Sequence, residues 1–492
     1  MSLVIVGGGI IGLAIAYFVT SSDPSRKVII LDSEQSLFLS ASGFSGGFIV
    51  RDWFGAAVLP LAELSFRLHR ELADAHDGRR QWGYTPSIGY SLVTQDQGSG
   101  QKVRGEDWLL TGTSRAEVAR KYAGASLSPT NSGPDLESTG SESDSNNACR
   151  DRDASLRPDG SPLWANIPAG GVLEKISSPA GCAQVEPREL CEWLLQRCRD
   201  RGVQLSLSTK PVGFVRNAAG KVVGVQVQRR AANESDIAGA GVGVDVGVQT
   251  QTQTQMQNAR IRCKDVVIAA GCWTPRVFET LTGKKMHIGI RPLPGYSITV
   301  RSPRYRRPIL EHDETGTGRK VETSHSIFCP PGRDWDYSPE AMARQTKDGN
   351  PEVYVAGLNN ESHRLPELAG QSKRLMEKPL MDHLKRTAVN LVGKSQGQGQ
   401  SPPIDDLHVV REALCFRPVS DSGKPIISRV DNIATAAGGG LYVASGHGPW
   451  GITLSLATGF VLAEVLQGKT PTVALDEFTL RPQKSEYLQS ML

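Results

Sequence analysis

The sequence lacks cysteine pairs, long hydrophobic runs and a large excess of one charge. Its eight cysteines form no CxxC pair and no Cys/His spacing typical of zinc, so they are expected to be reduced thiols, and no metal site is predicted. The net charge of +4 over 492 residues gives no reason to expect a nucleic-acid partner. Glycines interrupt the apolar stretch from Leu3 to Val19, so no membrane span is expected.

The N-terminus and the C-terminus bear on localisation. A first strand that begins at Leu3 leaves no room for a cleavable targeting segment, so the cytoplasm is expected. The alternative is the peroxisome, because Ser490-Met491-Leu492 partly matches its C-terminal signal, although the basic middle residue of that signal is missing.

The length exceeds what one hydrophobic core usually supports, so two joined domains with insertions are expected. Three polar, Gly-rich stretches are predicted to be low-complexity insertions because they cannot bury much apolar surface: 95–160, 230–259 and 393–404. The first predicted domain combines 1–60, 170–285 and 405–480, and the second combines 61–94 and 286–392.

The first forty residues have the order of a dinucleotide-binding unit. The apolar run Leu3–Val6 leads into Gly7-Gly8-Gly9-Ile10-Ile11-Gly12, and a second run at 28–31 ends on Asp32. The glycines at 7, 9 and 12 suit a tight turn, a close approach to pyrophosphate and helix–strand packing. Asp32 is placed to bind ribose hydroxyls and disfavours a 2′-phosphate, so NAD and FAD both remain open at this point.

Other segments predict the surrounding elements. The runs 28–31 and 266–269 are typical of strands buried in a parallel sheet, and 10–20 predicts the helix that follows the first strand. Segment 187–202 begins with Pro187 and ends at Gly202, which indicates an amphipathic helix. Segments 287–301 and 351–357 are predicted to be strands of a second, more antiparallel sheet.

Further along, the chain resembles a known family. The segment 40–48 is a run of small residues that, considered alone, predicts only a flexible loop. Together with the dinucleotide turn it resembles the FAD-binding start of the D-amino-acid oxidase and glycine/sarcosine oxidase superfamily. The resemblance continues through 266–274, 291–296, 415–427 and 440–452, and it is closest to a fungal and plant branch of FAD-dependent oxidoreductases with poorly defined substrates.

This resemblance implies an α/β fold and an FAD cofactor. The first predicted domain would be a Rossmann-type FAD-binding domain, with a parallel sheet and a β-meander, and it would be interleaved with the second, a mixed α+β substrate domain. The cofactor-binding residues implied are Gly7, Gly9, Ile10, Ile11, Gly12, Asp32, Ser33, Ser42, Gly43, Gly46, Gly47, Val212, Gly271, Trp273, Gly446, Gly448, Gly451 and Ile452. A helix that begins near Ile452 would direct free N–H groups at the flavin and stabilise its reduced, anionic form.

The resemblance also implies substrate residues. Arg417 falls where glycine oxidases hold the substrate carboxylate, and Arg51 falls where sarcosine-oxidase-type members have a substrate arginine. Tyr296 and Trp450 are candidate walls of the substrate site. Pro449 and Thr453 stand where related enzymes have a second cation, so a larger or less polar amine than glycine is admitted.

Two further positions leave alternatives. Cys415 aligns with the cysteine that carries flavin covalently in sarcosine-oxidase-type enzymes, but Phe48 replaces the arginine that assists there, so non-covalent FAD and a buried structural thiol are favoured. His447 is interpreted as a hydrogen-bonded turn residue in preference to a general base.

The predicted function is oxidation of an amine or amino acid by hydride transfer to flavin N5, with O2 as acceptor and H2O2 as product. The partners expected are therefore a small-molecule substrate and O2. Two alternatives remain: a flavin dehydrogenase with another acceptor, and a flavin-bound regulatory or trafficking protein with vestigial redox activity.

Overall fold

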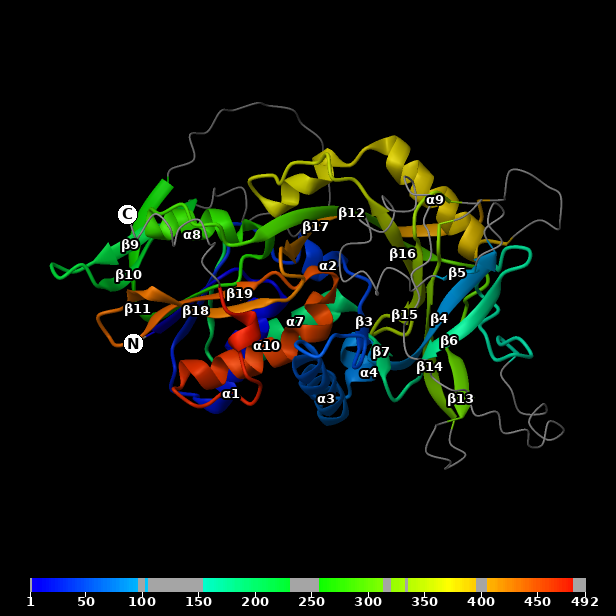
Figure 1. Ribbon diagram of the computed structural model, residues 1–492, viewed down its shortest axis with the longest axis horizontal. Helices are drawn as coiled ribbons and strands as arrows, with labels where there is room; N and C mark the ends of the chain where they lie inside the picture. The colour runs from blue at the N-terminus through cyan, green and yellow to red at the C-terminus, as the bar shows by residue number, and fades with distance from the viewer. Residues whose placement is uncertain are drawn as a thin grey trace, which may run out of the picture.

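The computed structural model describes residues 2–95, 102–104, 154–230, 256–312, 320–331, 335–394 and 405–480. These residues form two β-sheets with helices packed around them (Figure 1). The arrangement confirms the predicted fold class, a Rossmann-type unit joined to a mixed α+β unit.

The first sheet is built around parallel strands that carry the dinucleotide turn. Its path follows the order β18-β19-β11-β1-β2-β8, and β9 and β10 extend it as a meander onto β11. The strands are β1 (Ser2–Val6), β2 (Val28–Leu31), β8 (Gln204–Ser206), β9 (Thr209–Arg216), β10 (Val222–Arg230), β11 (Met256–Ile268), β18 (Ile426–Ala434) and β19 (Gly440–Ser445). The buried runs predicted at 28–31 and 266–269 therefore lie in this sheet, with β1 between them in parallel pairing.

Helices cover this sheet and bring the N-terminal and C-terminal parts of the described chain together. The helices are α1 (Ile10–Ser22), α3 (Leu59–Ala75), α7 (Pro187–Asp200), α8 (Thr274–Thr282) and α10 (Gly451–Leu466). The predicted helix at 187–202 is confirmed as α7, which has Pro187 in its first turn and Gly202 just beyond its end. Helix α10 packs against α1 and α3, so the first and last helices of the described chain are neighbours (Figure 1).

Segment 448–466, which includes α10, is long and apolar enough to cross a membrane by length and composition alone. Core helices of soluble proteins meet the same criteria, and most of α10 is buried against its neighbours.

The second sheet follows the order β17-β12-β16-β15-β14-β4-β7-β3 and is mostly antiparallel, as predicted for 287–301 and 351–357. Its strands are β3 (Phe48–Val50), β4 (Thr85–Gln95), β5 (Lys102–Arg104), β6 (Val172–Ser177), β7 (Cys182–Gln184), β12 (Ile290–Arg301), β13 (Ile309–His312), β14 (Lys320–Phe328), β15 (Glu340–Gln345), β16 (Pro351–Asn359) and β17 (His408–Ser420). Helix α9 (Lys378–Val392) packs on β12 and β16. Strand β17, within the range assigned to the FAD-binding domain, pairs along its length with β12.

Much of the predicted insertions lies outside the described residues, namely 96–101, 105–153, 231–255 and 395–404, as does 490–492. Within the stretch 230–259, residues 256–259 form the beginning of β11 and pair with β10. The segment 40–48 also differs from the loop that its composition predicts, because Ala41–Phe44 forms the short helix α2 and Phe48 begins β3. The seven cysteines in the described part of the chain are buried and free, as expected for reduced thiols.

Candidate active site

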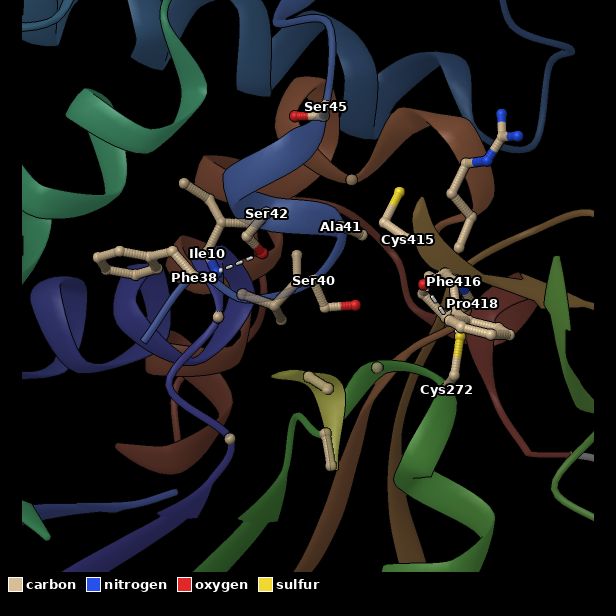
Figure 2. Close-up of a pocket in the computed structure, with 18 of the residues that line it drawn as sticks. Ile10, Phe38, Ser40, Ala41, Ser42, Ser45, Cys272, Cys415, Phe416 and Pro418 are labelled. Carbon is tan, nitrogen blue, oxygen red and sulfur yellow. Dashed lines mark hydrogen bonds between the residues drawn. The ribbon is translucent and has the colours of Figure 1, made fainter. Parts of the chain in front are cut away.

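The turn between β1 and α1 requires glycine at two positions. Gly7 has a φ of +113°, and a Cβ there would overlap the carbonyl oxygen of Ala269 at the end of the neighbouring strand. A Cβ on Gly12 would overlap the carbonyl oxygen of Gly7, so α1 packs directly on the turn. The N-cap residue of α1 is Gly9, which has no side chain to cap the helix. The backbone N–H of Ile10 donates to Ser42 Oγ at 3.1 Å (Figure 2).

Asp32 is fixed at the end of β2 by backbone groups. Its Oδ2 accepts a hydrogen bond from the N–H of Gly8 at 2.9 Å, and its Oδ1 accepts from the N–H of Glu34 at 3.0 Å. Burial raises the pKa of Asp32, and the two backbone donors act against this shift. The carboxylate is thus held beside the Gly-rich turn, as required for a ribose contact.

A single cavity of about 310 Å³ connects these features with the second sheet. Most of the predicted site residues line it: Gly7, Gly9, Ile10, Ile11, Asp32, Ser33, Ser42, Gly46, Gly47, Gly271, Trp273, Tyr296, Arg417, Gly448, Gly451 and Ile452. Gly12, Gly43, Val212 and Gly446 do not line the cavity, and near Val212 its wall is formed by Lys210 and Pro211. Gly12 and Gly43 lie behind it, where a Cβ would overlap backbone carbonyl oxygens.

The loop after α2 is compressed between two parts of the protein. Gly47 has a φ of +83°, and a Cβ there would overlap the carbonyl oxygen of Val185. A Cβ on Gly46 would lie 2.5 Å from Met342 Sδ and 3.0 Å from Tyr354. The loop therefore passes close to β15 and β16 of the second sheet. Ser42 and Ser45 lie across the cavity from Cys415 of β17 (Figure 2).

The end of the cavity away from Asp32 lies at the N-terminus of α10. The chain leaves β19 through Gly446 and Gly448, which have φ values of +81° and +57°, and no side chain caps the helix. The first-turn amides therefore face this end of the cavity, where Gly451 and Ile452 line the wall.

His447 lies in this turn and is buried. Its Nε2 is 3.0 Å from Thr458 Oγ1, which confirms the prediction of a hydrogen-bonded turn residue. Burial lowers the pKa of His447 to about 3, so the ring is neutral near pH 7 and is a weak base.

Arg417 extends from β17 to the cavity. Its Nη2 donates to Asn359 Oδ1 at the end of β16, and its Nε is buried without a hydrogen-bond partner. In the described part of the chain no carboxylate lies within 4.0 Å of this guanidinium. The site therefore presents a positive charge that a neutral amide holds in place.

Tyr296 forms another part of the wall, beneath a segment that we call the strap (360–377). The Tyr296 hydroxyl accepts from the N–H of Glu377 at 3.0 Å and lies 2.8 Å from His363 Nε2. Burial raises the pKa of Tyr296, so the phenol stays protonated near neutral pH.

The strap is also fixed at the far end of the cavity. Trp273 Nε1 donates to the carbonyl of Pro366 at 2.8 Å, and the N–H of Gly370 donates to Glu34 Oε1 at 2.7 Å. Residues 367–369 line the cavity between these points. The strap thus forms part of the wall from Tyr296 to the end of β2.

The structure does not bring Arg51 to the cavity. Arg51 is exposed, pairs with Asp52 at 3.2 Å and lines an open surface depression beside Arg67 and Arg70. Pro449 lines the cavity, whereas Thr453 is turned away and donates to the carbonyl of Phe48 at 3.1 Å. Neither position supplies the second cation of the related enzymes.

Cys415 lines the cavity and is buried, with its sulfur drawn toward the space beside α2 in Figure 2. Burial raises the pKa of the Cys415 thiol, with Arg417 acting in the opposite direction. The thiol form therefore dominates at neutral pH, which disfavours nucleophilic attachment of a ligand.

Several cavity residues were missed by sequence reasoning. Phe328, Glu340, Met342 and Tyr354 line the end that contains Arg417, and Asn359 holds that arginine. Phe48 and Phe328 pack with their ring centroids 5.5 Å apart, and Trp450 lines the same region. The residues from β14, β15 and β16 follow no recognisable motif, since only strand register brings them together.

The residues present fit a dinucleotide with an extended ring system. The Gly7 turn provides space that a Cβ would fill, the N-cap residue of α1 is Gly9, which has no side chain, and Asp32 lies at one end. The cavity continues past Ser42 and Gly46 to the α10 N-terminus, so it extends well beyond an ADP moiety.

Comparisons with known proteins agree with this arrangement. The chain matches the family "FAD dependent oxidoreductase" over residues 2–133 and 162–465. A Schizosaccharomyces pombe protein named "Putative oxidoreductase C1F5.03c" is 24% identical over 96% of both chains. Glycine oxidase from Geobacillus kaustophilus is similar in fold, with a TM-score of 0.59, 18% identity and 98% of each chain covered. Iminodiacetate oxidase from Chelativorans sp. BNC1 has a TM-score of 0.58 and 17% identity, over 97% of this chain and 98% of that one. The match to the family spans nearly all of both sheets and the whole cavity region, so the chain belongs to the FAD-dependent oxidoreductase family.

Proposed function

We propose that this protein oxidises the carbon–nitrogen bond of an amine or amino acid that carries a carboxylate. FAD, when bound, supplies the hydride acceptor for such a reaction. The substrate loses a hydride from carbon and a proton from nitrogen, and water hydrolyses the resulting imine to a carbonyl product and an amine or ammonia.

The observation that carries this proposal is the Arg417 guanidinium in the cavity without a carboxylate partner among the described residues. A substrate carboxylate would satisfy the buried Nε and orient the substrate for the reaction. Two proteins of similar fold are named for oxidation of glycine and of iminodiacetate, which supports a substrate of this general class.

The rest of this end of the cavity favours a substrate with a large apolar group. Phe48, Phe328, Met342 and Trp450 line the wall, and Pro449 stands where a second cation is found in related enzymes. A dicarboxylate would lack a second cationic partner at that position, whereas an apolar side chain would be buried against the aromatic rings.

The proposed acceptor is O2, which would be reduced to H2O2. The test is a panel of amino acids and N-alkylated amino acids, with H2O2 and the carbonyl product measured in parallel. We expect turnover of members with bulky apolar side chains, and at least about a hundredfold loss of kcat/KM in Arg417→Ala because a buried charge contact is removed. Equal turnover of a substrate and its decarboxylated analogue would contradict the role of Arg417.

Stopped-flow reoxidation distinguishes the oxidase from a dehydrogenase. After anaerobic reduction by a substrate, air should reoxidise the enzyme faster than it reoxidises free reduced flavin. If reoxidation is no faster and an artificial acceptor supports turnover, the reaction is that of a dehydrogenase.

We also propose that FAD is bound non-covalently. The raised pKa of the buried Cys415 thiol and the presence of Phe48 in the cavity wall support this proposal. Acid precipitation of the purified protein should leave the yellow colour in the supernatant, and Cys415→Ala should retain FAD. A yellow pellet that becomes colourless in Cys415→Ala would show covalent attachment.

A further inference from the structure

Asn359, Arg417 and Gly295 form a compact unit across three strands of the second sheet. Strand β12 lies between β16 and β17, and Gly295 on β12 pairs with Asn359 on one side and with Cys415 on the other. A Cβ on Gly295 would overlap Arg417 Nη2 and would lie 2.9 Å from Asn359 Oδ1. The absence of a side chain at Gly295 therefore leaves the space through which the guanidinium reaches the amide.

The chemistry of the Asn359 side chain matters because an amide oxygen accepts a hydrogen bond without neutralising the guanidinium. A carboxylate at this place would form a charge-assisted pair with Arg417 and would compete with any anionic ligand. Another buried arginine in this sheet is paired with acids: Arg344 lies 3.4 Å from Glu186 and 3.6 Å from Glu352. Both arginines have a buried Nε without a hydrogen-bond partner, but Arg417 differs from Arg344 in that its partner is a neutral amide and no carboxylate among the described residues lies within 4.0 Å of it.

We propose that Asn359 is a positioning residue that fixes Arg417 through a neutral amide and so keeps one full positive charge for a single ligand carboxylate. Gly295 provides the space for this contact. The inference rests on the proposed function, because it concerns the ligand of the same cavity. It adds that the charge selectivity of the site is set by Asn359, a residue that need not touch the ligand.

Benzoate is a suitable probe because it joins one carboxylate to an aromatic ring, and benzamide has the same shape without the charge. Binding to the FAD-loaded protein is measured by the change in flavin absorbance, so no substrate is needed. Wild type should bind benzoate more tightly than benzamide. Arg417→Ala should lose this difference.

The two central variants are Asn359→Asp and Gly295→Ala. Asn359→Asp should weaken benzoate binding about tenfold or more, since the new carboxylate pairs with Arg417, and should leave benzamide binding unchanged. Gly295→Ala should weaken benzoate binding to a similar extent by displacing the flexible end of Arg417, without a change of charge. The matched control is Asn217→Asp, in which the same substitution is made in an exposed turn outside the cavity, where the side-chain oxygen accepts from the N–H groups of Ala219 and Lys221.

The outcomes separate this inference from the proposed function. If Arg417→Ala loses benzoate binding while Asn359→Asp and Gly295→Ala bind it like wild type, the role of Asn359 is wrong and the proposed function stands. If Arg417→Ala binds benzoate like wild type, both are wrong. If Asn359→Asp weakens benzoate and benzamide equally, Asn359 has only a structural role and the inference is overturned. If Asn359→Asp does not fold, benzoate and benzamide binding to Gly295→Ala is used in its place to test the role of Asn359.

Discussion

Gly7 occupies the position where the chain leaves β1 and turns into α1. Its φ of +113° is strained for any residue with a Cβ, and the space around it is closed by the backbone at Ala269. Backbone cannot move aside as the end of a flexible side chain can. The same residue thus determines both the stability of the turn and the approach of a pyrophosphate.

Gly7→Ala should lower the free energy of unfolding by roughly 2–4 kcal/mol, from backbone strain and overpacking combined. The FAD content of the purified variant should fall as well. The measurements are chemical unfolding and the ratio of flavin to protein absorbance. Gly213→Ala is the matched control, because a Cβ there has nothing within 4 Å and the backbone is unstrained. Full FAD content in Gly7→Ala would contradict the assignment of the turn.

Sequence reasoning at the residue scale succeeded where a motif has a fixed mechanical role. Gly7, Asp32 and Ser42 lie where their order along the chain predicts. Arg51 was expected at the substrate and lies at the surface, because the three residues of β3 end at Val50 and the chain then runs outward. Asn359 follows no motif, since its contact with Arg417 depends on the register of three strands.

At the scale of elements, sequence patterns predicted α1, α7 and the buried strands β2 and β11, whereas α3, α8 and α9 were not predicted. They could not predict α2, which is one turn long, or the strap, whose place depends on contacts with Tyr296, Trp273 and Glu34 that are distant in sequence. Loss of the strap should affect ligand retention without unfolding the sheets, because residues 360–377 belong to no strand and 367–369 line the cavity.

Trp273→Phe should test this role of the strap. Loss of the Nε1 hydrogen bond to Pro366 removes about 0.5–1.5 kcal/mol, which should raise the FAD dissociation constant roughly two- to tenfold. The measurement is the titration of apoprotein with FAD, followed by flavin fluorescence. Trp335→Phe is the control, since its Nε1 makes the same kind of bond, 2.8 Å to the carbonyl of Pro330, and Trp335 does not line the cavity. If both variants bind FAD equally well, the strap does not contribute to retention.

At the scale of the whole molecule, helix packing depends on buried neutral histidines. His69 of α3 is buried, its Nε2 lies 3.0 Å from the carbonyl of Ile452, and burial lowers its pKa to about 4. The ring is therefore neutral in the folded protein, and Nε2–H is the donor. An unfolded chain takes up a proton on this residue near its ordinary pKa of 6.5.

Stability should consequently fall as the pH falls from about 6.5 toward 4, because only the unfolded chain binds the proton in that range. For His69 alone the loss between pH 7 and pH 5 is roughly 2 kcal/mol. His69→Gln, whose amide can donate in place of Nε2, should show a smaller loss over the same range. Chemical unfolding at the two pH values measures it, with the exposed His408→Gln as control. An unchanged pH dependence in His69→Gln would show that His69 is not neutral in the folded state.

The contact between α1 and α10 has a consequence for how the protein is made. A Cβ on Gly459 would lie 2.5 Å from the backbone of Ala14, so the two helices touch directly, and the cavity between their N-termini needs both. A ribosome adds roughly 5–20 residues per second, so the glycine turn of the nascent chain waits tens of seconds for α10. During that interval the part of the cavity wall formed by α10 is missing, so we expect stable capture of FAD only after α10 has emerged. Flavin incorporation is then expected late in the synthesis of each molecule, as a sign that the chain has been completed through α10.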